Sequence, residues 1–218
     1  EALLDNNINM PVSTVITQVI VDKNDKAFAN PTKPIGAFYS EKEAQEMIDS
    51  KGFSMVEDAG RGWRRVVPSP LPIDVAEKEI VRTLVDAGSV VITVGGGGIP
   101  VVKEDHRLVG VAAVIDKDFA SAKIAEIMDA NYLIILTAVE KVAINFGKEN
   151  EKWLDKMTIE EAIQHIKEGH FAPGSMLPKI EAALKFAESK KGRKSLITSL
   201  EKAEDGIEGK TGTLIINE

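Results

Sequence analysis

Strand-length apolar runs alternate with helical segments from Pro72 onward, and this alternation constrains the fold more than any other feature. The runs at 89–94 and 132–137 are apolar on both faces, whereas 73–87 and 175–190 carry apolar residues at helical spacing. Strands that are apolar on both faces and alternate with helices are typical of a mostly parallel sheet covered on both sides. The sequence therefore predicts an α/β fold.

Two capping boxes mark the starts of further helices. Ser40 and Glu43 begin one that ends near Gly52, and Thr158 begins another that ends near Glu168. The other expected elements are a helix at 118–128, one or two strands at 12–22, strands at 195–200 and 213–217, an apolar run at 109–115, and a hairpin at 56–67 turned around Ala59 to Gly62.

The segment 23–72 differs from the rest of the chain in its proline content and in its predicted secondary structure. It holds five of the nine prolines and only one clear helix. A proline-rich segment with a single helix fits a small lobe that is inserted into a larger fold. We therefore divide the chain into a core, 1–22 and 69–218, and a protruding subdomain, 23–68.

The composition excludes several classes of protein. The chain has no cysteine, which removes disulfide scaffolds, thiolate metal sites and thiol nucleophiles. Its net charge of −7 argues against bulk nucleic-acid binding, and no apolar run reaches the roughly 20 residues that a membrane helix needs. The three histidines, His106, His165 and His170, are not spaced as a metal-binding helical pair, so no metal ligand and no catalytic histidine is predicted. No secretory leader is visible, and we expect a cytoplasmic protein.

Four consecutive glycines, Gly95, Gly96, Gly97 and Gly98, directly follow an apolar strand. Their backbone amides can approach an anion closely, and loops at the carboxyl ends of strands are where α/β sheets bind ligands. The spacing matches neither a P-loop nor the dinucleotide fingerprint. A mobile turn is the alternative to an anion-binding loop.

Two lysines lie close to the predicted starts of helices. Lys117 stands between Asp116 and Asp118, which indicates either a cap with surface charge or a lysine that a carboxylate orients toward phosphate. Lys179 follows a loop rich in glycine and proline, in a first turn where the helix dipole disfavours a cation. A bound anion would compensate this charge, and an ordinary surface lysine is the alternative.

The proline-rich lobe contains two further cationic features. Lys33 lies between Pro31 and Pro34, so its backbone is stiff. Three arginines at 61, 64 and 65 cluster around Trp63, where a solvated hairpin stacked on the indole is the simpler interpretation.

Six motifs, in order along the chain, closely resemble those of carbamate kinases, which belong to the amino-acid-kinase superfamily. They are residues 30–36 (NPTKPIG), 57–64 (EDAGRGWR), 67–70 (VPSP), 95–101 (GGGGIPV), 113–118 (AVIDKD) and 169–179 (GHFAPGSMLPK). The resemblance implies a three-layer αβα sandwich with a small protruding subdomain. It also implies reversible phosphoryl transfer between ATP and carbamate, which gives ADP and carbamoyl phosphate and usually makes ATP in arginine breakdown. A homodimer and Mg²⁺ bound with the nucleotide are expected on the same ground.

The resemblance also implies roles for individual residues. Lys117 and Lys179 would neutralise charge on the transferred phosphoryl group, Asp118 would hold these lysines in place, and Gly95 to Gly98 would line the carbamate and phosphoryl end. The implied nucleotide-binding residues are Lys33, Thr137, Ala138, Val139, Asn145, Phe146, Gly174, Ser175 and Met176.

The sequence departs from the carbamate kinase pattern at its start. Family members carry a Gly-Gly-Asn-Ala loop and a Gly-Asn-Gly-Pro-Gln-Val-Gly loop, and neither is present. We therefore expect a chain that lacks an N-terminal segment, possesses most of the nucleotide-binding part, and has a possible partner in the missing segment. Two alternatives stay open: a nucleotide-binding fragment that is inactive on its own, and another amino-acid kinase such as an acetylglutamate kinase.

Overall fold

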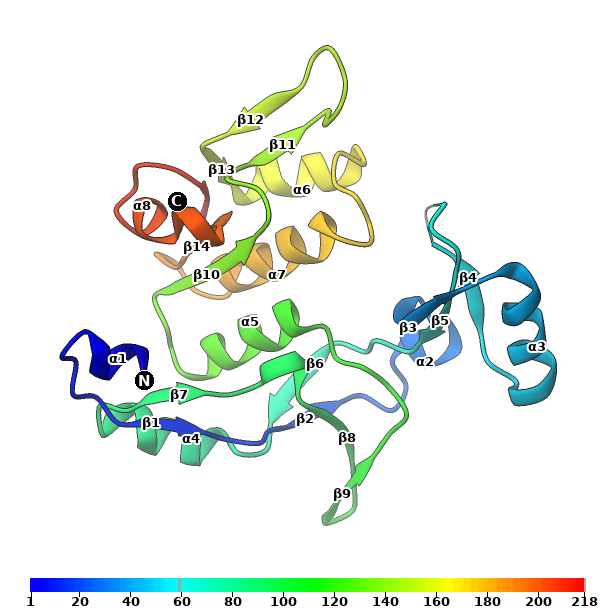
Figure 1. Ribbon diagram of the computed structural model, residues 1–218. Helices are drawn as coiled ribbons and strands as arrows, with labels where there is room; N and C mark the ends of the chain where they lie inside the picture. The colour runs from blue at the N-terminus through cyan, green and yellow to red at the C-terminus, as the bar shows by residue number, and fades with distance from the viewer. Residues whose placement is uncertain (59, 218) are drawn as a thin grey trace.

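The computed structural model describes residues 1–58 and 60–217 and shows a mixed α/β fold with a lobe set to one side (Figure 1). Strands β1, β7, β2, β6, β8 and β9 lie in one half of the core, and β10, β13, β14 and β15 lie in the other. The lobe carries a sheet of its own, made of β3, β4 and β5. The predicted α/β class is confirmed.

The first half of the core contains a four-stranded sheet in the order β6-β2-β8-β9. The strand β2 runs parallel to β8 and antiparallel to β6, while β1 and β7 form a separate parallel pair. The elements are α1 (Ala2–Asp5), β1 (Val12–Thr14), β2 (Gln18–Val21), β6 (Pro72–Val75), α4 (Lys78–Asp86), β7 (Val90–Ile92), β8 (Ile99–Glu104) and β9 (Arg107–Gly110).

The second half is built on the sheet β10-β14-β15-β13, in which β10/β14 and β13/β15 are parallel and β14/β15 is antiparallel. A hairpin of β11 and β12 projects beside it (Figure 1). The elements are β10 (Tyr132–Thr137), β11 (Val142–Ile144), β12 (Lys152–Leu154), β13 (Lys156–Thr158), α6 (Ile159–Lys167), α7 (Met176–Glu188), β14 (Lys194–Ser199), α8 (Ala203–Ile207) and β15 (Thr213–Ile216).

Helices cover both faces of β14. Ser195 donates a 2.8 Å hydrogen bond to the carbonyl of Ala183 on α7. Gly206 on α8 lies against Leu196 and Thr198, which point to the other face because side chains alternate along a strand. This half of the core is therefore the expected αβα sandwich.

The helix α5 (Lys117–Ile127) joins the two halves. Its residues Ala120 and Ile124 belong to the apolar core of the first half, together with Val19 and Val75. Its residue Ala122 belongs to the core of the second half, which is built largely on α7. The N-terminal end of α5 consequently lies where the two halves meet.

The lobe contains α2 (Lys26–Ala29), β3 (Lys33–Tyr39), α3 (Glu41–Lys51), β4 (Met55–Glu57) and β5 (Trp63–Val67). The two outer strands both pair antiparallel with β5. Its arginines do not stack on the indole: Arg65 lies 3.8 Å over the ring of Phe53, and Arg61 and Arg64 lie 5.0 and 5.1 Å from that of Phe38. The phenylalanines are nearer because they come from the parts of the chain that pack against β5. The boundaries 23–68 remain our proposed division.

Most predicted elements are present, and one was wrong. The capping boxes at Ser40 and Thr158 form and begin α3 and α6. The segment 73–87 is not one helix, because its first residues belong to β6 and only Lys78–Asp86 is helical. Val75 is fully buried and pairs with Val19, so sheet pairing prevails there over helical spacing. The predicted hairpin turn includes Ala59, which lies outside the described residues.

None of the helices in the described parts of the chain is long and apolar enough to cross a membrane.

Candidate active site

Charged side chains from three parts of the chain meet at the N-terminal end of α5. Asp116 caps this helix, and its carboxylate accepts a 2.9 Å hydrogen bond from the amide of Asp118. The cap holds both aspartates at the junction between the halves, with about one tenth of each side chain exposed. Buried carboxylates need cationic or hydrogen-bonding partners, and lysines supply them here.

Asp118 holds two lysines at once. Its Oδ1 accepts a hydrogen bond from Lys117 at 3.2 Å, and its Oδ2 accepts one from Lys179 at 2.7 Å. The Lys179 side chain is 15% exposed and that of Lys117 is 60% exposed, so one ammonium is fixed and the other reaches toward solvent. Asp118 thus contacts both of the lysines that the sequence analysis grouped with it.

Asp116 holds a third lysine, which comes from the lobe. Lys33 Nζ lies 2.5 Å from Asp116 Oδ2 and so links β3 to the core. Burial acts to raise the pKa of Asp116, but the hydrogen bonds from Lys33 and the Asp118 amide outweigh it, and the pKa lies below its ordinary value. Asp116 is therefore ionised at neutral pH.

A cavity of about 570 Å³, which we name the lysine cavity, opens beside these groups. The predicted site residues in its lining include the three lysines, residues at the end of β10 and residues of the loop before α7. Its lining is Lys33, Gly96, Val114, Ile115, Asp116, Lys117, Asp118, Thr137, Ala138, Val139, Gly174, Ser175, Met176, Pro178 and Lys179.

The glycine loop has two structural roles: one glycine lines the cavity, and another permits close packing of the backbone. Gly96 alone of the four glycines appears in the described lining of the lysine cavity. Gly97 is buried with φ +107°, and a Cβ on it would lie 2.1 Å from the carbonyl oxygen of Ile115, so this glycine permits a close backbone approach. The loop is entered through Val94 at φ 46°, an outlier for a β-branched residue, whose amide is held by the buried hydroxyl of Thr17 at 2.9 Å.

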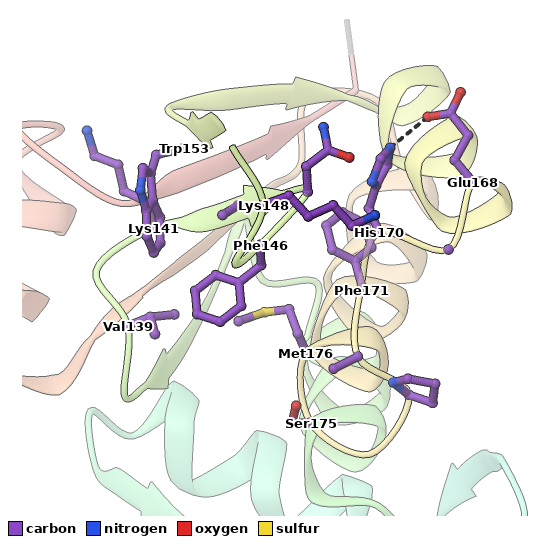
Figure 2. Close-up of a pocket in the computed structure, with 15 residues that line it drawn as sticks. Val139, Lys141, Phe146, Lys148, Trp153, Glu168, His170, Phe171, Ser175 and Met176 are labelled. Carbon is purple, nitrogen blue, oxygen red and sulfur yellow. Dashed lines mark hydrogen bonds and ion pairs between the residues drawn. The ribbon is translucent and has the colours of Figure 1, made fainter. Parts of the chain in front are cut away.

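A second cavity of about 480 Å³ lies beside the lysine cavity and shares Val139, Ser175 and Met176 with it. We name it the aromatic cavity, because Figure 2 shows Phe146, Trp153 and Phe171 around it. It contains the two remaining predicted nucleotide-binding residues, Asn145 and Phe146, whereas Gly95, Gly97 and Gly98 line neither cavity. Its lining is Val139, Lys141, Ala143, Asn145, Phe146, Lys148, Trp153, Glu168, Gly169, His170, Phe171, Ala172, Pro173, Ser175 and Met176.

Several residues of the site were not among those predicted. Asp116 could have been found, because it belongs to the same Asp-Lys-Asp triplet as the predicted pair. Trp153 could not, because β11 and β12 are three residues each and carry no clear strand signal. Only this hairpin brings Trp153 into edge contact with Phe146, with ring centroids 6.1 Å apart.

The lysine cavity is suited to an anion with several charges. Three ammonium groups face two carboxylates in its lining, and the N-terminal ends of α5 and α7, with their positive dipole ends, border it. The described lining contains no histidine and no serine–histidine pair. The arrangement can therefore bind and stabilise charged oxygens, and it does not offer a side-chain nucleophile with its base.

Comparison with known proteins identifies relatives that match almost the whole chain. The profile of the Amino acid kinase family matches residues 13–199. The chain is 65% identical to "Carbamate kinase-like protein YqeA" of Escherichia coli (strain K12) and 55% identical to the carbamate kinase of Clostridium perfringens, with 99% of this chain and 69% of each relative covered.

A solved structure agrees with these relatives. The carbamate kinase from Giardia lamblia bound to AMP-PNP superposes with a TM-score of 0.88 at 44% identity, over 100% of this chain and 69% of that one. The chain therefore belongs to the amino acid kinase family of phosphotransferases, and within that family it is similar to the carbamate kinases.

Proposed function

We propose that the chain carries the phosphoryl-transfer site of a carbamate kinase, with the reversible reaction ATP + carbamate = ADP + carbamoyl phosphate. The observation that carries this proposal is the double hydrogen bond of Asp118 to Lys117 and Lys179 at the lysine cavity. Carbamate kinases at 50–55% identity are the second support.

The residue types suit this chemistry. Phosphoryl transfer depends mainly on positioning and on electrostatic stabilisation of the transferred oxygens. Carbamate is already an oxyanion, so no general base is needed to activate it. Lys117 and Lys179 would bring positive charge to the transferred group, and Asp118 would keep both ammonium groups in place.

The nucleotide is proposed to span both cavities. Its phosphates would lie in the lysine cavity near Lys33, and its base and sugar would lie between Phe146 and Met176 in the aromatic cavity. The shared lining at Val139, Ser175 and Met176 supports one continuous ligand. The relative bound to AMP-PNP shows that a protein of this fold takes an ATP analogue.

The aspartates offer no carboxylate oxygen reserved for Mg²⁺. Asp116 Oδ1 accepts the Asp118 amide and Oδ2 accepts Lys33, while both oxygens of Asp118 accept lysines. Mg²⁺ often keeps several waters and binds through substrate phosphates. We therefore propose that Mg²⁺ arrives with the nucleotide.

Three further proposals rest on the family resemblance alone. They are a place in arginine catabolism in the direction of ATP formation, a cytoplasmic location, and a homodimer. The net charge of −7 is compatible with a soluble metabolic enzyme but does not by itself support any of the three.

A coupled assay tests the function. The chain is given ADP and carbamoyl phosphate, ATP formation is followed through hexokinase, and nucleotide binding is measured in parallel by calorimetry. ATP formation supports the carbamate kinase proposal. Nucleotide binding without turnover supports the second candidate, a binding module, which is motivated by the chain spanning 69% of its relatives. Turnover with acetylglutamate, and none with carbamate, would overturn both.

A further inference from the structure

Two histidines and a glutamate lie together at the C-terminal end of α6, and His170 and Glu168 line the aromatic cavity but not the lysine cavity. Figure 2 shows His170 and Glu168 at the edge of this cavity, joined by a dashed line. His170 Nε2 lies 3.0 Å from Glu168 Oε2, and His165 Nδ1 lies 3.5 Å from the same oxygen. The phosphoryl-transfer proposal gives these groups no role.

The turn that ends α6 brings the two imidazoles together. Gly169 takes φ +73°, and the amide of His170 donates to the carbonyl of His165 at 3.2 Å, so the chain folds back over the last helical turn. The ring centroids then lie 5.4 Å apart. A spacing of five residues is not that of a helical ligand pair, and for this reason the sequence predicted no metal ligand.

One nitrogen of the cluster has no hydrogen bond. His165 Nδ1 is buried, and no described residue satisfies it. A buried imidazole nitrogen without a partner is costly unless something else binds it. It lies 3.5 Å from the carboxylate oxygen that His170 also approaches, so all three potential ligand atoms lie within 4.8 Å of one another.

The two distances from the Glu168 oxygen fit a tetrahedral metal ion, and the imidazole nitrogens would have to adjust to complete the tetrahedron. The three ligand atoms all lie within 4.8 Å of one another. Ligands at about 2.0–2.1 Å from Zn²⁺ in a tetrahedron are about 3.3 Å apart, close to the two distances from Glu168. A small rotation of the imidazoles would complete the arrangement.

A neighbouring side chain already orients the carboxylate. Gln164 Nε2 donates a 2.7 Å hydrogen bond to Glu168 Oε1 and so leaves Oε2 to face the histidines. Hydrogen bonds of this kind, which hold a ligand from outside the coordination sphere, are a regular part of metal sites.

We propose that His165, Glu168 and His170 bind a divalent cation of the Zn²⁺ class through two imidazole nitrogens and one carboxylate oxygen. The fourth position is left to water on the side of the aromatic cavity. None of its ligands lines the lysine cavity, whereas Glu168 and His170 line the aromatic cavity that is proposed to hold the nucleotide base.

The test is a titration of the metal-free chain with Zn²⁺ against a chromophoric chelator. We expect one ion per chain. H165Q and H170Q should each weaken binding by more than about 100-fold, since loss of an outer hydrogen bond alone costs about 10–100-fold. Q164A removes only the outer hydrogen bond to Glu168, so it should weaken Zn²⁺ binding by about 10–100-fold. H106Q is the matched control, because His106 is the third histidine and lies in the β8–β9 turn, and it should bind as the parent chain does.

Substitution with Co²⁺ gives a second measurement. A tetrahedral site should show the intense visible absorption of four-coordinate Co²⁺, which H170Q should remove, and circular dichroism checks that each variant is folded. The proposal is overturned if the folded parent chain takes no Zn²⁺ from the chelator in the titration, or if H165Q and H170Q bind as tightly as H106Q.

Discussion

Lys179 donates a 2.7 Å hydrogen bond to Asp118, although 61 residues separate them. Each lies in the first turn of a long helix, Lys179 on α7 and Asp118 on α5. The positive ends of two helix dipoles and a lysine therefore converge on one carboxylate. Asp118 and Asp116 together do not balance three lysines and two helix N-termini, which favours an anionic ligand at the same place.

Replacement of Lys179 by alanine should slow phosphoryl transfer. If this ammonium stabilises the transferred oxygens, K179A should lower kcat about 10²–10³-fold, the usual loss for one such group. The measurement is the coupled assay at saturating ADP and carbamoyl phosphate. The control is K202A, because Lys202 pairs with Asp205 at the exposed start of α8 and lines neither cavity. A near-normal kcat for K179A would contradict the role given to this lysine.

The pair of Lys33 and Asp116 should make stability depend on pH at the acid side. The pKa of Asp116 lies below its ordinary value of 3.8, so the pair contributes its full stabilisation above that value and loses it as the pH falls through the lowered pKa. In K33M the carboxylate stays buried without its cation, and the free energy of unfolding at pH 7 should fall by about 1–3 kcal/mol.

Urea unfolding of the parent chain, K33M and D116N between pH 7 and pH 3 measures this effect. The difference between the parent chain and D116N should shrink as the pH falls. A difference that stays constant down to pH 3 would show that the fold does not lower the pKa of Asp116.

Alanine at Gly97 should destabilise the glycine loop. Its Cβ would meet the carbonyl oxygen of Ile115 at 2.1 Å, and its φ of +107° is unfavourable for any residue with a side chain. We expect a loss of more than about 2 kcal/mol in the free energy of unfolding. Gly95 is the matched control in the same loop, since no atom lies within 4 Å of its Cβ position and its φ is not positive. Equal thermal midpoints for G97A and G95A would refute the close approach.

Neutralising Glu181 should stabilise the chain at neutral pH. Burial raises the pKa of this carboxyl on α7 above its ordinary value of 4.5, with Lys185 offsetting only part of the effect. The charged form is thus disfavoured in the fold, and this cost disappears as the pH falls through the raised pKa toward 4.5. E181Q should gain up to about 1 kcal/mol at pH 7, discounted for partial exposure, and the gain should vanish near pH 4. E188Q, at an exposed position on the same helix, should change little at either pH.

Local signals in the sequence accounted for much of the fold. Each capping box joins two residues three positions apart by reciprocal hydrogen bonds between side chain and backbone amide, Ser40 with Glu43 and Thr158 with Glu161. Two nearby residues therefore determine where α3 and α6 each begin. The strand β6 escaped prediction because its partner β2 lies more than 50 residues earlier, and Val75 is extended only because Val19 is opposite to it. Periodicity within a window cannot report such a pairing.

Some residues of the candidate site could likewise be predicted from the sequence, and others could not. Asp118 and its two lysines were identified through motifs that resemble carbamate kinases, and the structure places them within hydrogen-bonding distance. The glycine motif was harder to interpret, because Gly97 serves the backbone of Ile115 and its sequence neighbour Gly96 serves the cavity. Adjacent identical residues carry no signal that separates these two uses. Trp153 depends on a hairpin that forms only against the rest of the second half.

The placement of α5 in both apolar cores has a consequence for how the protein melts. Ala120 and Ile124 anchor this helix in one core and Ala122 anchors it in the other. Neither half can release its core without removing α5 from the other, so the two halves are expected to unfold in a single cooperative transition. The aspartates at the start of α5 are therefore held in position only while both halves are folded.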